Sequence, residues 1–226
     1  MISYLPPLLV LFVSAVLIAV RRLYLGRTAE NSKPEGAVER SARRRADFLI
    51  GFAILFITAM TLLAMGRTPS YKYGPIRLWS GDIKSDQNSQ QIADPYTFTH
   101  VIHGIGFYAL LRLVPAPLTL GTRVIAALSA ESAWEVFENS DLVINRYRTA
   151  TLSLDYYGDS VINSIFDIIV SMLGFFFAAR FPARASIILV IFIEVALAFL
   201  IRDNLFLNIF LLLFPVTAIK NWQLGL

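Results

Sequence analysis

The chain has 226 residues, of which 56% are hydrophobic and only 16% are charged, and its formal net charge is +4. About a quarter of the residues of a soluble domain are charged, so this composition, with a mean hydropathy of +0.61, excludes an ordinary soluble protein. The absence of cysteine excludes disulfides, thiolate nucleophiles and cysteine-ligated metals.

The hydrophobic residues are concentrated in blocks that are long enough to cross a bilayer, which takes about twenty helical residues. We expect spans at 3–20, 48–65, 97–114, 121–138, 160–179, 185–201 and, shorter than the others, 205–219. Spans this long cannot all be core helices of a small soluble protein. The predicted fold class is therefore all-α, a polytopic transmembrane bundle of about seven (six to seven) spans.

Charge sets the expected topology. The first block, in 1–20, is predicted to be a retained transmembrane helix, because a basic region follows it instead of preceding it. Residues 21–47 hold eight of the twenty Lys and Arg residues and are predicted to form a basic cytoplasmic loop. The N-terminus is then outside and the C-terminus cytoplasmic, and 48–226 is a multi-span domain with an external loop at 66–96. The basic residues act as topology determinants, and no nucleic-acid partner is expected.

This topology brings polar residues from three predicted spans to one depth, near the outer leaflet. His100 and His103 are three residues apart in the span 97–114 and face one partner helix. The glutamates of the next span follow at i, i+4 and i+7, so Glu131, Glu135 and Glu138 form one stripe. The span 160–179 carries a third set at steps of four residues, formed by Asp159, Asn163 and Asp167.

Ionisable groups inside membrane spans are costly and usually mark ion paths, proton relays or catalytic sites. Imidazole and carboxylate groups together suit zinc, manganese or iron. The predicted ligands of a divalent metal ion are His100, His103, Glu135 and Asp159. The predicted catalytic acids or bases are Glu131, Glu135, Asp159 and Asp167. The residues predicted to bind an anionic substrate group are Arg146, Arg148, Arg202 and Asn163. The opposing interpretation is a network of salt bridges that only holds helices together.

The loop 66–96 combines Pro and Gly with interfacial aromatic residues, Tyr71, Tyr73 and Trp79, followed by many amide and hydroxyl side chains. Two interpretations stay open for it. It is either a surface loop with an aromatic anchor or a lid over the polar residues.

Several blocks resemble a known family. "LWSGDIKSDQNSQQIADPYTFTHVIHGIGFY", "ESAWEVFENS", "RTATLSLDYYGDSVINSIFDI" and "IRDNLFLNIFLLLFPVTAIKNWQ" are similar to the bacterial membrane-protein family called domain of unknown function 2585. The resemblance covers about 60–223, so the first span and the basic loop are an addition to it. It implies a compact multi-pass protein of the bacterial inner (cytoplasmic) membrane, without an assigned activity. Gln91 departs from the family pattern, in which a His is expected.

Three functions fit these features. The first is a membrane enzyme that acts on a lipid or lipid-linked substrate at the periplasmic leaflet, with a ligand set that allows a divalent metal ion as cofactor. The second is a proton- or ion-coupled carrier, for which Asp167 and Glu194 are the deepest polar groups. The third is an accessory or structural subunit of a larger membrane complex. Membrane lipids are expected partners in each case, and other membrane subunits in the third.

Overall fold

The structure is a computed structural model that describes residues 5–29, 37–116, 118–153 and 155–226. These residues form nine α-helices and no strand; the one isolated bridge pairs Trp79 with Ala93. The helices, in chain order, are α1 (Leu5–Ala29), α2 (Ala37–Ala64), α3 (Thr97–Leu113), α4 (Leu120–Glu138), α5 (Asp141–Ala150), α6 (Val161–Arg180), α7 (Ala183–Ile201), α8 (Leu205–Leu213) and α9 (Thr217–Leu224). The all-α fold class is confirmed.

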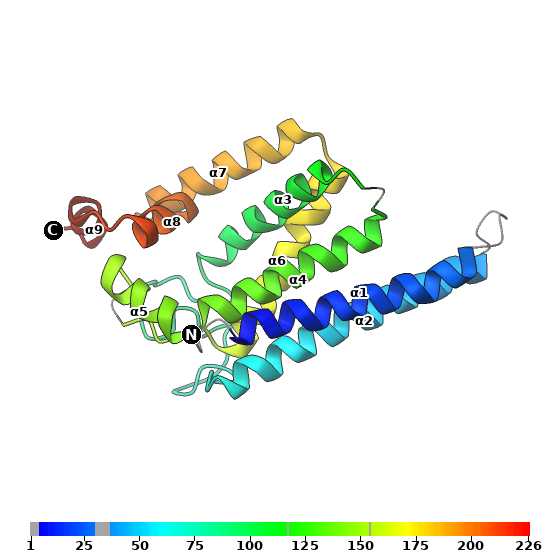
Figure 1. Cartoon of the computed structure of the whole chain (residues 1–226). Helices are drawn as coiled ribbons and strands as arrows, with labels where there is room; N and C mark the ends of the chain where they lie inside the picture. The colour runs from blue at the N-terminus through cyan, green and yellow to red at the C-terminus, as the bar shows by residue number, and fades with distance from the viewer. Residues whose placement is uncertain (1–4, 30–36, 117, 154) are drawn as a thin grey trace.

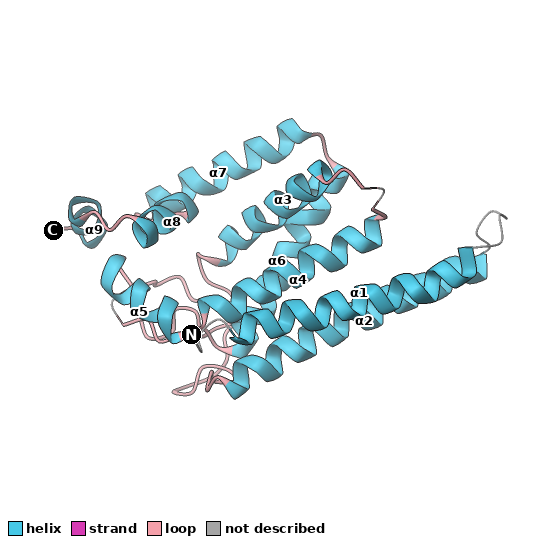
Figure 2. Ribbon diagram, viewed as in Figure 1, coloured by secondary structure: helices cyan, strands magenta, loops and turns pink. Residues whose placement is uncertain are grey.

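The long helices lie roughly side by side, and the short ones gather at one end (Figure 1). α1 and α2 form a long pair that packs on α4, while α3 packs closely on α6 and α7 lies outside them. The loop 66–96, the short helices α5, α8 and α9, and the beginning of α1 are all at the same end. We call this the loop end of the bundle. Figure 2 shows that the short connection between α6 and α7 lies at the opposite end.

Local sequence explains where several helices begin. Ser140, Ser160 and Asn204 each precede a helix and accept a hydrogen bond from the backbone N–H three residues later, at the start of α5, α6 and α8 respectively. Such side chains satisfy backbone donors that have no partner inside the helix. At α8, the Glu194 carboxylate also accepts from the backbone N–H groups of Leu205 and Phe206, both at 3.1 Å. Glu194 is thus a structural cap, which accounts for a carboxylate in the middle of an apolar helix.

Three described helices are long and apolar enough to cross a membrane: Arg40–Ala64 within α2, α6 and α7. They mark the chain as a membrane protein. The apolar part of α1, Pro6–Ala19, is shorter. α8 has nine residues and at 1.5 Å per residue covers about 14 Å, less than half of the roughly 30 Å hydrocarbon core. The structure therefore does not confirm seven spans or the predicted orientation, and α9 lies at the same end as the beginning of α1 (Figure 1).

Helices also extend into segments that we expected to be loops. α1 continues to Ala29 and α2 begins at Ala37, so helical residues occupy much of the segment 21–47. The remainder of that segment, 30–36, lies outside the described residues. α5 occupies part of the predicted external connection between α4 and α6. The loop 66–96, in contrast, contains no helix, as expected.

Candidate functional site

The site depends on the close approach of α3 and α6, where two glycines face the opposite backbone. A Cβ atom on Gly104 would lie 1.7 Å from the carbonyl oxygen of Ser171, and one on Gly174 would lie 2.1 Å from that of Val101. Only glycine allows two helix backbones to come this close. The contact fixes the rotation of α3, and with it the direction of His103, the preceding residue, and of His100, one turn earlier.

His100 lies at the centre of a buried cluster from three helices. Its Nδ1 is 2.6 Å from Glu131 Oε1 and 3.3 Å from Glu135 Oε1, both on α4. Its Nε2 is 3.8 Å from Asp167 Oδ2 on α6. The three carboxylates are each at most 4% exposed. Burial without a partner would make such groups very costly, so the cluster must be held together by the imidazoles or by a bound cation.

His103 completes the cluster from the next turn of α3. Its Nδ1 lies 3.2 Å from both carboxylate oxygens of Glu131, and its ring meets the Trp134 ring edge-on at a centroid distance of 5.7 Å. Two sets of donor atoms lie close enough together to hold a metal ion. One is His100, His103 and Glu131; the other is His100, Glu135 and Glu138.

Beside this cluster, two tyrosines and two carboxylates form a second group at the loop end. The Tyr147 hydroxyl of α5 donates to Glu138 at 2.6 Å, and the Tyr156 hydroxyl donates to Asp159 at 2.9 Å. The two rings are 5.3 Å apart and roughly perpendicular. Asn139 holds Asp159 in place through two hydrogen bonds: its Nδ2 donates to the Asp159 carboxylate, and its Oδ1 accepts from the Asp159 backbone N–H.

Asp159 is held in an environment that favours its protonated form. Burial raises the pKa of Asp159 from 3.8 to about 7, and the nearby Glu138 carboxylate acts in the same direction, although the hydrogen bonds from Tyr156 and Asn139 oppose both. A carboxyl group with such a pKa can accept or donate a proton near neutral pH.

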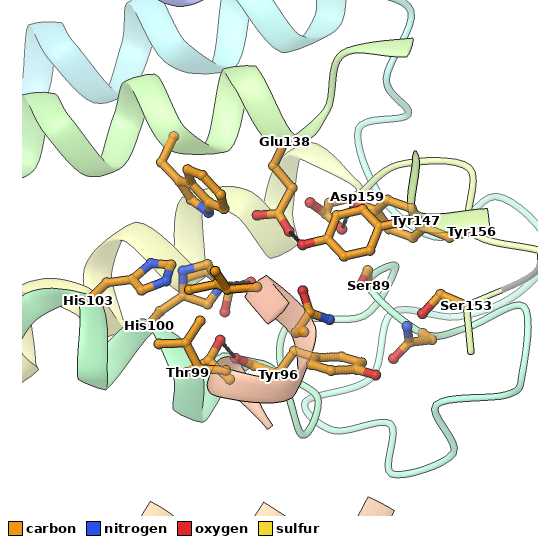
Figure 3. A pocket seen from close by; sticks show the side chains of 16 residues that line it. Ser89, Tyr96, Thr99, His100, His103, Glu138, Tyr147, Ser153, Tyr156 and Asp159 are labelled. Atoms are coloured by element: carbon orange, nitrogen blue, oxygen red, sulfur yellow. Dashed lines mark hydrogen bonds and ion pairs between the residues drawn. The ribbon is translucent and has the colours of Figure 1, made fainter. Parts of the chain in front are cut away.

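Both groups line one cavity of about 50 Å³ (Figure 3). The His100 and His103 side chains lie on one side of it, and Tyr147, Tyr156 and Asp159 lie on the other. Leu205, Asn208 and Ile209 of α8 add a further wall. The cavity is thus a small, partly open space at the loop end, lined by polar and apolar groups, with donor atoms that could hold a metal and carboxylates that could move protons.

The loop 66–96 contributes Asn88, Ser89 and Tyr96 to the wall of the cavity and is hydrogen-bonded to the bundle. The backbone N–H groups of Ser160, Val161 and Ile162, at the beginning of α6, donate to carbonyl groups of this loop at 2.8–3.1 Å. Ser89 lines the cavity and has a positive φ of 58°, which is uncommon for a residue with a side chain. The loop therefore forms part of the site. Gln91, where a His was expected, instead bonds within the loop, accepting from the Arg77 N–H at 2.6 Å.

The structure brings most of the predicted site residues together. The four residues within the His100 cluster are His103, Glu131, Glu135 and Asp167, and Asp159 lies on the facing wall. Asp159 does not belong to either set of metal-binding atoms among the described residues, whereas Glu131, predicted only as a catalytic group, does.

The residues predicted to bind a substrate lie elsewhere. Arg146 donates to the Leu212 carbonyl at 2.7 Å, Arg148 to the Tyr156 carbonyl, and Arg202 to the Trp222 carbonyl at 3.2 Å. None of these arginines is among the described residues that line the cavity. Asn163 is buried near the loop, with its Nδ2 3.5 Å from the Ile92 carbonyl.

Sequence reasoning missed the aromatic part of the site. Trp134, Tyr96, Tyr147 and Tyr156 line the cavity, and none of them was among the predicted site residues. Two signals were present in the sequence. Trp134 lies beside the glutamate stripe on α4, and Tyr156 is three residues before Asp159, within reach of a local hydrogen bond.

Comparison with known proteins identifies the family. Residues 62–225 match the family model described as "Protein of unknown function (DUF2585)". A UPF0314 protein of Paracoccus denitrificans is 49% identical over 184 residues, covering 81% of this chain and 95% of the relative. UPF0314 proteins of Rhizobium etli and Sphingopyxis alaskensis are 45% and 42% identical, over 84% and 80% of this chain and 97% and 96% of the relatives. No solved structure matches the chain. The family resemblance inferred from the sequence blocks is thus confirmed, and the chain belongs to the DUF2585 family of bacterial proteins.

Proposed function

We propose that this chain is a multi-pass enzyme of the bacterial inner membrane that uses a divalent metal ion to act on a lipid or lipid-linked substrate. The observation that carries the proposal is the buried cluster of His100, His103 and Glu131, whose donor atoms lie within 4.8 Å of one another beside a cavity. Two imidazoles and one carboxylate form the ligand set of many catalytic zinc sites, which keep one position open for water or substrate.

The geometry of the cluster fits an ion with little rearrangement. Two ligand atoms bound to zinc at about 2.0 Å in a tetrahedron are about 3.3 Å apart. The separation between His103 Nδ1 and Glu131 Oε1 is 3.2 Å, close to that value, whereas His100 Nδ1 lies nearer to Glu131, at 2.6 Å. A small rotation of the His100 ring would lengthen this separation toward the value expected for two zinc ligands.

Buried oxygens without a hydrogen-bond partner also support a bound cation. Glu135 Oε1 and Asp167 Oδ1 are buried and have none among the described residues. Native proteins seldom leave such atoms unsatisfied, and an ion or its bound water would satisfy them.

The chemistry follows from the positions of the side chains. A divalent ion here would supply a Lewis acid and an activated water. Glu135 lies beside His100 and is placed to accept a proton from a water on that side. Asp159 and Tyr156, on the facing wall, are placed to hold or return a proton to a leaving group.

The location of the cavity supports action at the outer leaflet. The cavity is at the loop end, and Arg112, Arg123, Arg180 and Arg184 flank the helix ends on the opposite side. Basic residues at the ends of spans favour the cytoplasm, which would place the loop end toward the periplasm.

The test is elemental analysis of the full chain, purified in detergent without chelators, together with Glu131→Gln and His103→Ala. We expect a transition metal at about one ion per wild-type chain and its loss in both variants. Asp141→Asn is the control, since Asp141 is a carboxylate at the same end with 88% of its side chain exposed. Wild-type protein that neither retains nor takes up a transition metal would refute the mechanism, and the cluster would then be a structural network.

A further inference from the structure

The wall of the cavity that faces the histidines combines aromatic rings with carboxylates. Tyr147 and Tyr156 lie beside Glu138 and Asp159, and each hydroxyl group is directed to one of these carboxylates. The hydroxyl groups are therefore used within the protein. The two rings pack edge to face on each other, and both residues still line the cavity, where a ligand can meet the rings. Cations bind well to the electron-rich faces of aromatic rings, and more strongly where water is excluded.

The lining also carries a strong charge asymmetry. Glu138, Asp159 and Asp167 line the cavity, and none of its described lining residues is Lys or Arg. The nearest arginines in the sequence, Arg146 and Arg148, donate to backbone carbonyls instead. His100 and His103 line the opposite side of the cavity. Beside Glu138 and Asp159, away from these imidazoles, a phosphate or carboxylate group would meet carboxylates and no Lys or Arg, whereas a positively charged group would find charge partners.

Three described residues that line the cavity each have a buried polar atom without a hydrogen-bond partner: the acceptors Asn88 Oδ1 and Asp167 Oδ1 and the donor Trp134 Nε1. A bound ligand could satisfy them. Asp167 is 4% exposed, lines the cavity, and has no hydrogen-bond partner for Oδ1 among the described residues. Trp134 also lines the cavity, and its Nε1 donor has no partner there. A ligand that satisfies these acceptors and this donor must offer a donor and an acceptor, as an amino alcohol does.

The volume limits the size of the ligand. A single water needs about 10–15 Å³ of such space, so a cavity of about 50 Å³ holds roughly three to five groups of that size. An aminoethyl group with its attached oxygen meets this limit, whereas a sugar ring exceeds it.

We propose that this cavity binds the ammonium group of a small amino alcohol, with Glu138 and Asp159 as its charge partners and Tyr147 and Tyr156 as its aromatic walls. The group is either the headgroup of an ethanolamine lipid or the free amine. The inference names the substrate class for the enzyme proposed above. It rests on that function for the chemistry that follows binding and for which metal set is used. The wall that holds the ammonium group shares no residue with His100, His103 and Glu131, whereas Glu138 belongs to the alternative set with His100 and Glu135.

Native mass spectrometry of the full chain tests the proposal. The protein is incubated with equal amounts of phosphatidylethanolamine and phosphatidylglycerol of identical acyl chains, with and without free ethanolamine. We expect retention of phosphatidylethanolamine at about ten times the level of phosphatidylglycerol, or, if the free amine is the ligand, saturable binding of ethanolamine itself. Displacement of the lipid by ethanolamine would show that the ammonium group is recognised in both forms.

Variants show whether the proposed wall is responsible. Glu138→Gln and Tyr147→Leu should each lower the preference about tenfold, while Tyr147→Phe, which keeps the ring, should retain most of it. Asp141→Asn, outside the cavity, should behave as wild type. Thermal unfolding of each variant separates loss of binding from loss of fold, and Tyr147→Phe against Tyr147→Leu is informative as long as both fold.

Equal retention of the two lipids together with no binding of ethanolamine would overturn the proposal, as would a preference that survives Glu138→Gln and Tyr147→Leu. The measurement is repeated after chelation. A preference that survives chelation would show that ammonium binding does not need the metal. An ammonium preference in wild-type protein that neither retains nor takes up a metal would refute the metal-dependent mechanism and leave this inference standing.

Discussion

Gly104 of α3 lies directly against the backbone of α6 at Ser171, where a Cβ atom would be 1.7 Å from the carbonyl oxygen. Gly174 makes the reciprocal contact with Val101, at 2.1 Å. The two contacts keep α3 and α6 in register one turn from His100 and Asp167. The geometry of the candidate site therefore depends on two residues that carry no functional group.

Gly104→Ala should push α3 away from α6, because the added methyl group meets backbone that cannot yield locally. We expect the free energy of unfolding to fall by about 1–3 kcal/mol or more, with a parallel loss of metal binding. Gly106→Ala is the matched control, since a Cβ there has nothing within 4 Å. Thermal unfolding in detergent compares the two. Equal behaviour of both variants would contradict the close packing of α3 on α6.

Asn139→Ala should destabilise the loop end of the bundle. Asn139 is fully buried and exchanges two hydrogen bonds with Asp159, of 2.8 and 2.7 Å. Its removal leaves a buried carboxyl oxygen and a backbone N–H without their partner, which costs about 1–3 kcal/mol for each group. Asn145→Ala, at an exposed position of α5, should change the unfolding temperature little. A wild-type unfolding temperature for Asn139→Ala would show that Asp159 does not depend on this link.

Asp203 should make stability depend on pH. Burial raises its pKa from 3.8 to about 6, despite hydrogen bonds from Tyr96, Asn208, the Asn204 N–H and Gln223. Between these two values the unfolded chain is ionised and the folded chain is protonated. Stability therefore decreases as the pH rises from about 4 to about 6, by roughly 3 kcal/mol in total, and the penalty is complete above pH 6.

Asp203→Asn removes this titration and keeps a side chain that accepts a hydrogen bond. As the pH rises from 4 to 7, the unfolding temperature of wild type should therefore fall relative to that of Asp203→Asn. A difference that is constant over this range would contradict the raised pKa of Asp203.

The proposed orientation can be tested with single cysteines, because the chain has none of its own. Lys84→Cys lies in the exposed part of the loop 66–96, and Arg184→Cys lies at the beginning of α7, at the opposite end. We expect a membrane-impermeant maleimide to label Lys84→Cys in intact spheroplasts and Arg184→Cys only after permeabilisation. The opposite pattern would place the cavity at the cytoplasmic face.

The approach of the histidines and carboxylates to one another could be predicted from the sequence, because it depends on residue spacing within each helix and on depth in the membrane. Steps of three and four residues place His100, His103, Glu131 and Glu135 on single helix faces, and the apolar blocks place those faces at one level. Spacing and depth do not determine which neighbouring segment a side chain is directed to. Arg146, Arg148 and Arg202 are near the same level, but each is turned to a backbone carbonyl of a neighbouring segment.

The predicted seventh span was not confirmed, for reasons that were partly visible in the sequence. Its apolar block contains Pro215, and the residue before a proline disfavours helical backbone, so α8 ends at Leu213. The capping of α8 by Glu194 could not be foreseen, because it depends on how α7 and α8 lie against each other. The block therefore folds into short helices at the loop end.

The most direct test of the central claim is X-ray absorption at the metal edge of the zinc-loaded protein. His100 and His103 are the only histidines in the chain, so any imidazole scattering must come from the proposed site. The account predicts nitrogen and oxygen ligands at about 2.0–2.1 Å with the signature of two imidazoles, and loss of this signature together with the bound zinc in His103→Ala. A spectrum of oxygen ligands alone, unchanged by that substitution, would contradict a metal held by His100, His103 and Glu131.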